Sequence, residues 1–503
     1  MCAKHLPRIT SALAAAALLS GCAVGPDFHR PTPPAIGGYT AQPPAATSST
    51  ANVAGGEEQR FVAGMDIPQQ WWTLFKSLPL NALIEKSLKA NPTIDAAKAA
   101  LRQARENVYA QKGFYYPTVQ GGYSASRTQD SGTISPVLSS GQEPYSLHTA
   151  QVSVGFVPDV FGSNRRQVES LAAQADFERF QLEATYLTLT SNVVATAIQE
   201  ASLRAQISGT LGIIEIETKM LDQLRRQFAL GYAAGLDVAA QEAALAQVQQ
   251  TLPPLQGQLA QTRDLLTALA GRFRNEELEE KFEFAALSLP QELPVSLPSK
   301  LVEQRPDVRA AEEQLHSASA QVGVATAAML PNITLSADWG SIATTMGELF
   351  TPGTGFWSLA GGLTQPLFQG GTLLHRKRAA EAGLRQAEAQ YRSTVIAAFQ
   401  NVADALHALQ SDADTLKAAA YFEQASKRRL DLTRRQFELG YVNYLSLLSA
   451  EQTWQQAMIN LVQARASRFA DTAVLFMALG GGWWNSPYLA SAAQTGEPDG
   501  KPN

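Results

Sequence analysis

Residues 225–232 read RRQFALGY and residues 434–441 read RRQFELGY, so seven of eight positions are identical at a separation of 209 residues. The match continues at the same separation, where Leu236 corresponds to Leu445 and Glu242 to Glu451. An internal repeat of this kind decides the fold, because each copy has to form the same supersecondary unit. Each copy lies between two long helical patterns and carries a glycine where the first pattern ends. We therefore predict two long helical hairpins with these stretches at their tips.

The helices predicted beside the tips are unusually long. Residues 163–230 contain no proline, and a rise of 1.5 Å per residue gives a helix of about 100 Å. Residues 371–439 predict a second helix of the same length, with apolar residues spaced at three and four as in a coiled-coil seam. Return helices are expected over residues 236–271 and 444–479. Small apolar residues on more than one face indicate that each helix packs between neighbours, as in a wall of helices.

Each half of the repeat also contains two stretches with the period-two pattern of a β-strand. In the first half they cover about residues 119–126 and 145–157, and in the second half 333–339 and 357–364. A half-buried sheet in a soluble core would give the same alternation. The small polar second face and strand lengths near the 9–11 residues of a membrane-spanning strand favour a membrane location. Because bacterial barrels begin at about eight strands, four strands per chain would require several chains to share one barrel.

The N-terminus has the pattern of a secretory signal followed by a lipid attachment site. Lys4 and Arg8 precede an apolar run from Ile9 to Leu19 that is too short to cross a bilayer, which predicts a signal peptide over residues 1–21. The run ends in LSGC, which resembles the lipobox of bacterial lipoproteins, so Cys22 is expected to become the lipidated first residue. An ordinary signal peptide with an incidental cysteine is the alternative. Proline, glycine and small residues then dominate, which predicts an extended lipid-anchored arm over residues 22–70.

Composition and motifs argue against several classes of function. The formal net charge of -5 gives no basic surface for nucleic acid. The six histidines are scattered without metal-ligand spacing, and both cysteines lie near the N-terminus, so we expect no metal site and no disulfide framework. Phosphate-binding and nucleophile motifs are missing from the sequence. We therefore expect no cofactor and no enzymatic activity.

Several further motifs resemble those of the outer membrane factor lipoproteins, the TolC-like channels of tripartite efflux pumps, in their NodT-type branch. Besides the lipobox and the two tip stretches, the matching pieces are GPDF at 25–28, WW at 71–72 with LNALI at 80–84, RPDVR at 305–309, PLFQGG at 366–371 and ALGG at 478–481. This resemblance implies an α+β membrane protein that forms a homotrimer in the outer membrane. Its twelve-stranded β-barrel, with four strands from each chain, would continue into a long periplasmic α-helical coiled-coil barrel.

The resemblance also implies partners for the hairpin tips. Leu230 and Gly231 in the first tip, and Leu439 and Gly440 in the second, would contact a periplasmic adaptor protein that is joined to an inner-membrane efflux transporter. In relatives, acidic residues of the second hairpin often narrow the mouth of the tunnel. This chain has serines at the matching positions, so its gate residues need a separate argument.

The candidate gate consists of four residues near the tips. Ser446 and Ser449 occupy the positions that are often acidic in relatives, and Asp237, which corresponds to Ser446 across the repeat, keeps a carboxylate. Leu445 could form an apolar collar that closes the mouth by dewetting. The alternative for Leu445 is that it only packs one hairpin against the next, as apolar residues at helical spacing usually do.

The expected function is passive export of small molecules, such as drugs or other toxic compounds, through a duct in the outer membrane. The alternatives are a channel for polypeptide secretion and a non-conducting structural lipoprotein of the cell envelope. The expected organisation is a signal peptide (1–21), a lipid-anchored arm (22–70), the first repeat (71–275), a connector (276–304), the second repeat (305–484) and a disordered tail (485–503).

Overall fold

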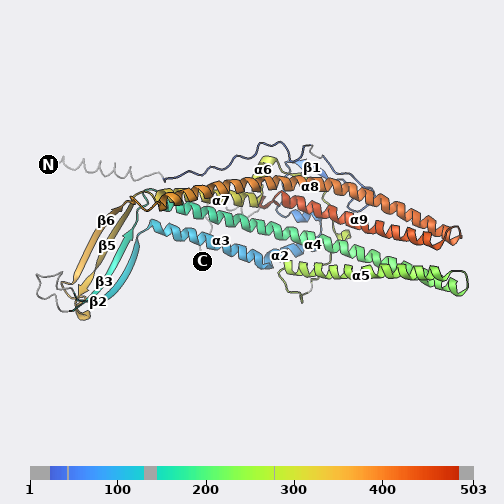
Figure 1. Ribbon diagram of the computed structural model, residues 1–503, viewed down its shortest axis with the longest axis horizontal. Helices are drawn as coiled ribbons and strands as arrows, with labels where there is room; N and C mark the ends of the chain where they lie inside the picture. The colour runs from blue at the N-terminus through green and yellow to red at the C-terminus, as the bar shows by residue number, and fades with distance from the viewer. Residues whose placement is uncertain (1–22, 42–44, 130–143, 277, 486–503) are drawn as a thin grey trace. The chain divides into compact units, whose positions relative to one another are not determined.

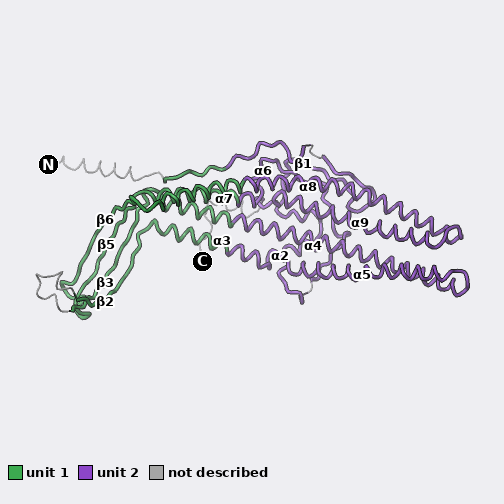
Figure 2. Tube along the Cα trace, in the orientation of Figure 1, with its two compact units in different colours: residues 1–30, 100–178, 311–391 green, residues 31–99, 179–310, 392–503 purple. Residues whose placement is uncertain are grey.

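The computed structural model describes residues 23–41, 45–129, 144–276 and 278–485 of the chain (Figure 1). The expected signal peptide, Cys22 and the expected tail beyond Asn485 therefore lie outside the described residues. The chain divides into two compact units, which are coloured separately in Figure 2. Unit 1 comprises Met1–Arg30, Ala100–Glu178 and Ala311–Tyr391, and unit 2 comprises Pro31–Ala99, Arg179–Ala310 and Arg392–Asn503.

The four long helices confirm the helical prediction. Helices α4 (Ser163–Ala229) and α8 (Thr372–Glu438) have 67 residues each, and the return helices α5 (Gly235–Leu269) and α9 (Tyr444–Ala478) have 35 each. The bounds of α8 and α9 lie 209 residues after those of α4 and α5, which is the separation of the two tip stretches. None of the helices in the described part of the chain combines the length and the apolar character needed to cross a bilayer.

Shorter elements complete the chain. The remaining α-helices are α2 (Leu78–Ala90), α3 (Pro92–Lys112), α6 (Pro298–Gln304) and α7 (Pro306–Ala327). Single 3₁₀ turns are η1 (Trp71–Phe75), η2 (Gly113–Tyr115), η3 (Phe284–Ala286), η4 (Met346–Glu348) and η5 (Trp483–Asn485). All four of these α-helices have a proline at their first or second residue, where its missing N–H costs nothing because the first turn leaves its N–H groups unpaired.

Unit 1 contains the predicted strands as one antiparallel sheet in the order β2-β3-β5-β6. The strands are β2 (Thr118–Thr128), β3 (Tyr145–Phe156), β5 (Asn332–Ala343) and β6 (Gly355–Thr364). In one register row Val154, Ala337 and Leu359 are neighbours, and in the next row Ser153, Asp338 and Ser358 are. The apolar face is largely exposed, including Trp339, Trp357 and Leu359. The sheet thus lacks the buried apolar face of the soluble alternative within this protomer.

Unit 2 contains a second, smaller sheet that the sequence did not predict. Strand β1 (Arg60–Ala63) in the N-terminal arm pairs in parallel with β4 (Glu292–Val295) in the connector. The fully buried Arg468 of α9 donates to Thr47 Oγ1 at 2.9 Å and to Gln59 Oε1 at 3.3 Å. The arm therefore packs against the helices instead of remaining only an extended tether.

The core of unit 2 joins motifs that are far apart in the sequence. Trp71 stacks on Phe476 with ring centroids 5.3 Å apart. Arg305 Nη1 donates to the carbonyl oxygen of Ala478 at 3.0 Å. Gly480 has a φ of +94°, and a Cβ there would lie 2.4 Å from the Gln304 carbonyl oxygen. The RPDVR and ALGG motifs therefore pack on each other, which holds the end of α9 against the start of α7.

Candidate functional site at the hairpin tips

Each predicted tip is a helix end closed by the same hydrogen-bonded turn. After α4, the Tyr232 N–H donates to Gln227 O at 2.8 Å, and the Gly231 N–H donates to Phe228 O at 2.9 Å. This is the Schellman arrangement, which needs a left-handed residue after the helix. Gly231 supplies it with a φ of +77°. The glycine in the repeated stretch is therefore explained by backbone geometry.

The second tip repeats this turn at the corresponding positions. The Tyr441 N–H donates to Gln436 O at 2.8 Å, and the Gly440 N–H donates to Phe437 O at 3.0 Å. Gly440 has a φ of +76°. Both tips lie at the same end of unit 2 (Figure 1). The structure thus brings together the two stretches that the sequence identified.

Apolar side chains at both tips point into solvent in the protomer. Leu230 is 71% exposed and Leu439 is 70% exposed, and Tyr232 and Tyr441 are exposed as well. Exposed apolar residues that gather at one end of a unit are typical of a surface that another protein covers.

The candidate gate residues occupy the first turns of the return helices. Asn443 Oδ1 caps α9 by accepting from the Ser446 N–H at 3.0 Å and from the Ser446 hydroxyl at 2.8 Å. Asp237 lies in the first turn of α5. Ser449 accepts from Arg429 Nη2 at 3.4 Å. In the structure Ser446 therefore donates to the cap residue Asn443, and Ser449 and Asp237 lie near the tips.

In this protomer Leu445 is not one of the buried residues where the two hairpins pack together. It is 55% exposed, whereas its neighbour Leu447 is fully buried in a cluster with Leu430 and Ala450. Met220 of α4 packs against that cluster, so the first hairpin contacts the second there. A side chain that faces solvent near the tip is available for a role between chains.

One ion pair occurs in both hairpins but in different surroundings. Arg225 Nη2 lies 2.7 Å from Glu242 Oε1 in the first hairpin, and Arg434 Nη2 lies 3.3 Å from Glu451 Oε1 in the second. The Glu242 side chain is 48% exposed, whereas that of Glu451 is only 5% exposed. The repeat therefore supplies the same pair once at the surface and once in the interior.

Burial shifts the pKa of the glutamate in the second ion pair, Glu451. Burial, followed by the charge of Glu217 on α4, raises the pKa of Glu451 to about 7, against the smaller effect of Arg434. Burial also raises the pKa of Glu217, whose Oε2 accepts from Gln241 Nε2 at 2.5 Å. Burial likewise raises the pKa of Tyr444. The pKa of Glu451 on the second hairpin thus depends on how closely Glu217 of the first hairpin packs near it.

Glu217 and Gln241 were missed by the sequence reasoning. Each lies in a long helix with polar residues on several sides, and only the packing of the helices against one another determines which of these polar residues are buried. No group of three or more histidine, cysteine, aspartate or glutamate residues in the described ranges could hold a metal ion. Cys22, the expected lipidation site, lies outside the described residues.

Comparison with known proteins gives consistent results along the chain. The sequence profile of the family described as Outer membrane efflux protein matches residues 83–272 and 297–481. The pyoverdine export outer membrane protein OpmQ of Pseudomonas putida is 30% identical over 457 residues, which cover 90% of this chain and 94% of that protein. The toluene efflux pump outer membrane protein TtgC of Pseudomonas putida is 28% identical over 470 residues, covering 93% and 94%.

Solved structures agree with the fold. The outer-membrane channel OprN superposes with a TM-score of 0.82 at 25% identity and covers 92% of this chain and 100% of its own. The Campylobacter jejuni CmeC outer membrane channel has a TM-score of 0.81 at 20% identity, with coverage of 94% and 98%.

Proposed function

The chain belongs to the outer membrane efflux protein family and is an outer-membrane exit duct for efflux, and we propose that it works as a passive homotrimer. The observation that carries the proposal is the four-stranded sheet. Among the described strands, β2 and β6 lie at the two edges of that sheet. Unpaired edges are satisfied when copies of the chain pair edge to edge. Three copies would give twelve strands, enough to close a barrel.

The two faces of the sheet suit lipid on one side and water on the other. Exposed apolar residues such as Leu335, Trp339 and Leu359 would contact lipid. On the opposite face the Ser358 hydroxyl donates to Asp338 Oδ2 at 3.0 Å. A polar, water-filled lumen of this kind would select little among the small molecules that pass through it.

The hairpin tips would connect this duct to the rest of a pump. The exposed Leu230 and Leu439 beside Gly231 and Gly440 would contact a periplasmic adaptor protein, and an inner-membrane transporter would supply the cargo and the energy. Relatives are named for pyoverdine export and for toluene efflux. Both names describe small molecules, so we propose small-molecule cargo for this chain.

The N-terminus would hold the duct in the outer membrane by acyl chains on Cys22, after removal of a signal peptide. Several acyl chains anchor a protein stably, whereas one alone binds only marginally. Cys22→Ser is expected to abolish incorporation of labelled palmitate. Continued labelling of that variant would exclude Cys22 as the attachment site.

An accumulation assay tests the proposed function. Cells that lack this duct are expected to retain a fluorescent efflux dye, and expression of the chain should restore its export. Retention of a secreted polypeptide without retention of dye would indicate the secretion channel instead. Normal export of both, with a weakened envelope, would indicate a structural lipoprotein.

A further inference from the structure

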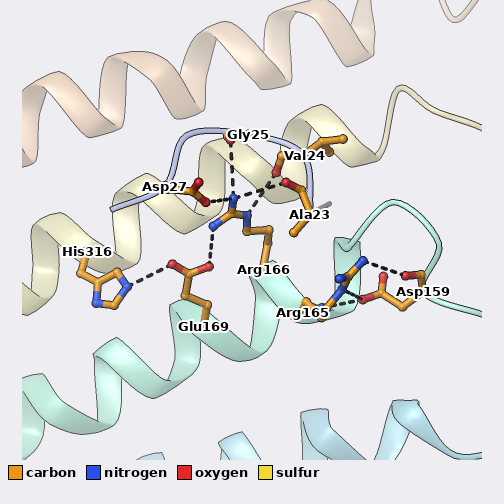
Figure 3. Close-up of polar contacts among 9 residues, drawn as sticks. All are labelled: Ala23, Val24, Gly25, Asp27, Asp159, Arg165, Arg166, Glu169 and His316. Atoms are coloured by element: carbon orange, nitrogen blue, oxygen red, sulfur yellow. Dashed lines mark hydrogen bonds and ion pairs between the residues drawn. The ribbon is translucent and has the colours of Figure 1, made fainter. Parts of the chain in front are cut away.

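The segment that directly follows Cys22 is held by one buried arginine in unit 1 (Figure 3). The side chain of Arg166, near the start of α4, is only 5% exposed. Its guanidinium contacts Val24 O at 3.1 Å, Ala23 O at 3.4 Å, Gly25 O at 3.5 Å and Asp27 Oδ1 at 2.6 Å. Hydrogen bonds from a charged donor are stronger than neutral ones. The hydrogen bond and charge of Arg166 also lower the pKa of Asp27.

Glycines let the segment approach the helices closely. A Cβ on Gly25, whose φ is +102°, would lie 2.4 Å from the Cα of Gly323 on α7. A Cβ on Gly323 would lie 2.8 Å from Arg166 Cγ. Both positions therefore exclude a side chain, because real Cβ atoms do not approach other atoms so closely. The fit at this point is specific to a glycine in the segment and a glycine in the helix.

The contacts continue along α7 as the segment proceeds. The Phe28 ring stacks on His316, with centroids 4.3 Å apart and planes 14° apart. His316 Nε2 lies 3.1 Å from Glu169 Oε1, and Glu169 Oε2 in turn accepts from Arg166 Nη1 at 2.8 Å. Arg30 Nε lies 2.6 Å from Glu312 Oε1. From Gly323 through His316 to Glu312, α7 thus offers a row of contacts that matches the segment.

We propose that α4 and α7 form a peptide-binding site whose ligand is the chain's own segment of residues 23–30, with Arg166 as its positioning residue. The ligand is recognised by a glycine at the closest approach, a carboxylate two residues later and an aromatic ring directly after it. This assigns a role to the GPDF motif, which the export function by itself leaves unexplained.

The start of the segment contacts the loop between β3 and α4. The Val24 N–H donates to Phe161 O at 3.2 Å, and a Cβ on Gly162 would lie 2.6 Å from the Ala23 Cα. Ala23, the first described residue of the segment, therefore lies beside the loop that joins β3 to α4.

Limited proteolysis of the purified full-length protein tests this site. Cleavage by chymotrypsin after Phe28 should require the segment to detach from its contacts with α4 and α7. Arg166→Met is expected to raise the rate of that cut by roughly tenfold or more, since it removes the charged donor. Arg166→Lys keeps the charge and should give an intermediate rate. Arg165→Met is the matched control, because the Nε of Arg165 contacts Asp159 at 3.3 Å within the loop before α4.

A variant in the segment itself controls for the possibility that Arg166→Met disturbs the helices. Gly25→Val leaves α4 and α7 unchanged but should expel the segment and expose the same cut. Cleavage at the parental rate in both Gly25→Val and Arg166→Met would overturn the proposal. The mass of the N-terminal fragment reports acylation separately: an unmodified Cys22 contradicts the lipid anchor alone, and rapid cleavage of an acylated parent contradicts the binding site alone.

Discussion

Replacing Glu451 by glutamine tests how the two hairpins are held together. In the folded protein the pKa of Glu451 is raised from its usual 4.5 to about 7, mainly by burial and then by the charge of Glu217. A raised pKa means that the packed state holds the proton more tightly than a state with separated hairpins. The contact is therefore most stable below pH 4.5, and it weakens as the pH rises until both states are ionised above about pH 7. Between these two pH limits, the free energy that stabilises the contact falls by at most ~3 kcal/mol.

Hydrogen exchange of α9 amides, corrected for the intrinsic effect of pH, measures this opening free energy. The parent is expected to lose stability at α9 between pH 5 and pH 8, and Glu451→Gln should lose much less. Glu242→Gln is the matched control, since Glu242 is the corresponding residue of the first hairpin with an exposed side chain. Its effect should stay within the ~0–1 kcal/mol of surface ion pairs. An equal pH dependence in the parent and in Glu451→Gln would refute the reasoning.

Other substitutions test the tips, the sheet and the gate. Gly440→Val forces a β-branched residue into a left-handed conformation at a cost of roughly 1–2 kcal/mol or more. Dye export should stop while crosslinked trimers persist. Unchanged export would show that this tip is not needed for efflux. Leu335→Arg should destabilise the membrane-inserted protein by roughly 2–4 kcal/mol if it lies near the membrane midplane, whereas the Ser336→Arg variant should insert normally. Equal loss of membrane-integrated protein in both variants would argue against a lipid-facing side of the sheet. Leu445→Ser should raise the resting conductance, and Asp237→Asn should weaken the preference for cations without widening the pore. If both variants behave like the parent, other residues form the constriction.

The parts of the fold that depend on local sequence were predictable. Gly231 and Gly440 end long helical patterns and are needed by the turn that closes each helix, so the tips follow from a short stretch. The alternation around Leu335 and Ser336 likewise needs only neighbours in the same strand. These predictions are confirmed by the helix and strand bounds of the structure.

The parts that depend on distant segments could not be predicted. Strand β1 has four residues and pairs with a strand more than two hundred residues away, so it shows no useful period. Glu451 and Glu242 are equivalent in the repeat, yet only packing against the other hairpin buries Glu451. Arg166 carries no sequence signal for binding the N-terminal segment, because its partners are mostly main-chain carbonyl groups. Burial and main-chain contacts of this kind arise from tertiary structure.

Single-channel recording in a planar bilayer tests the central claim most directly. The purified full-length protein, inserted from detergent, is expected to give discrete conductance steps, and Leu445→Ser should give larger or more frequent ones. Lipid-integrated protein that shows no conductance in either the parent or Leu445→Ser would contradict a duct and support a structural envelope lipoprotein.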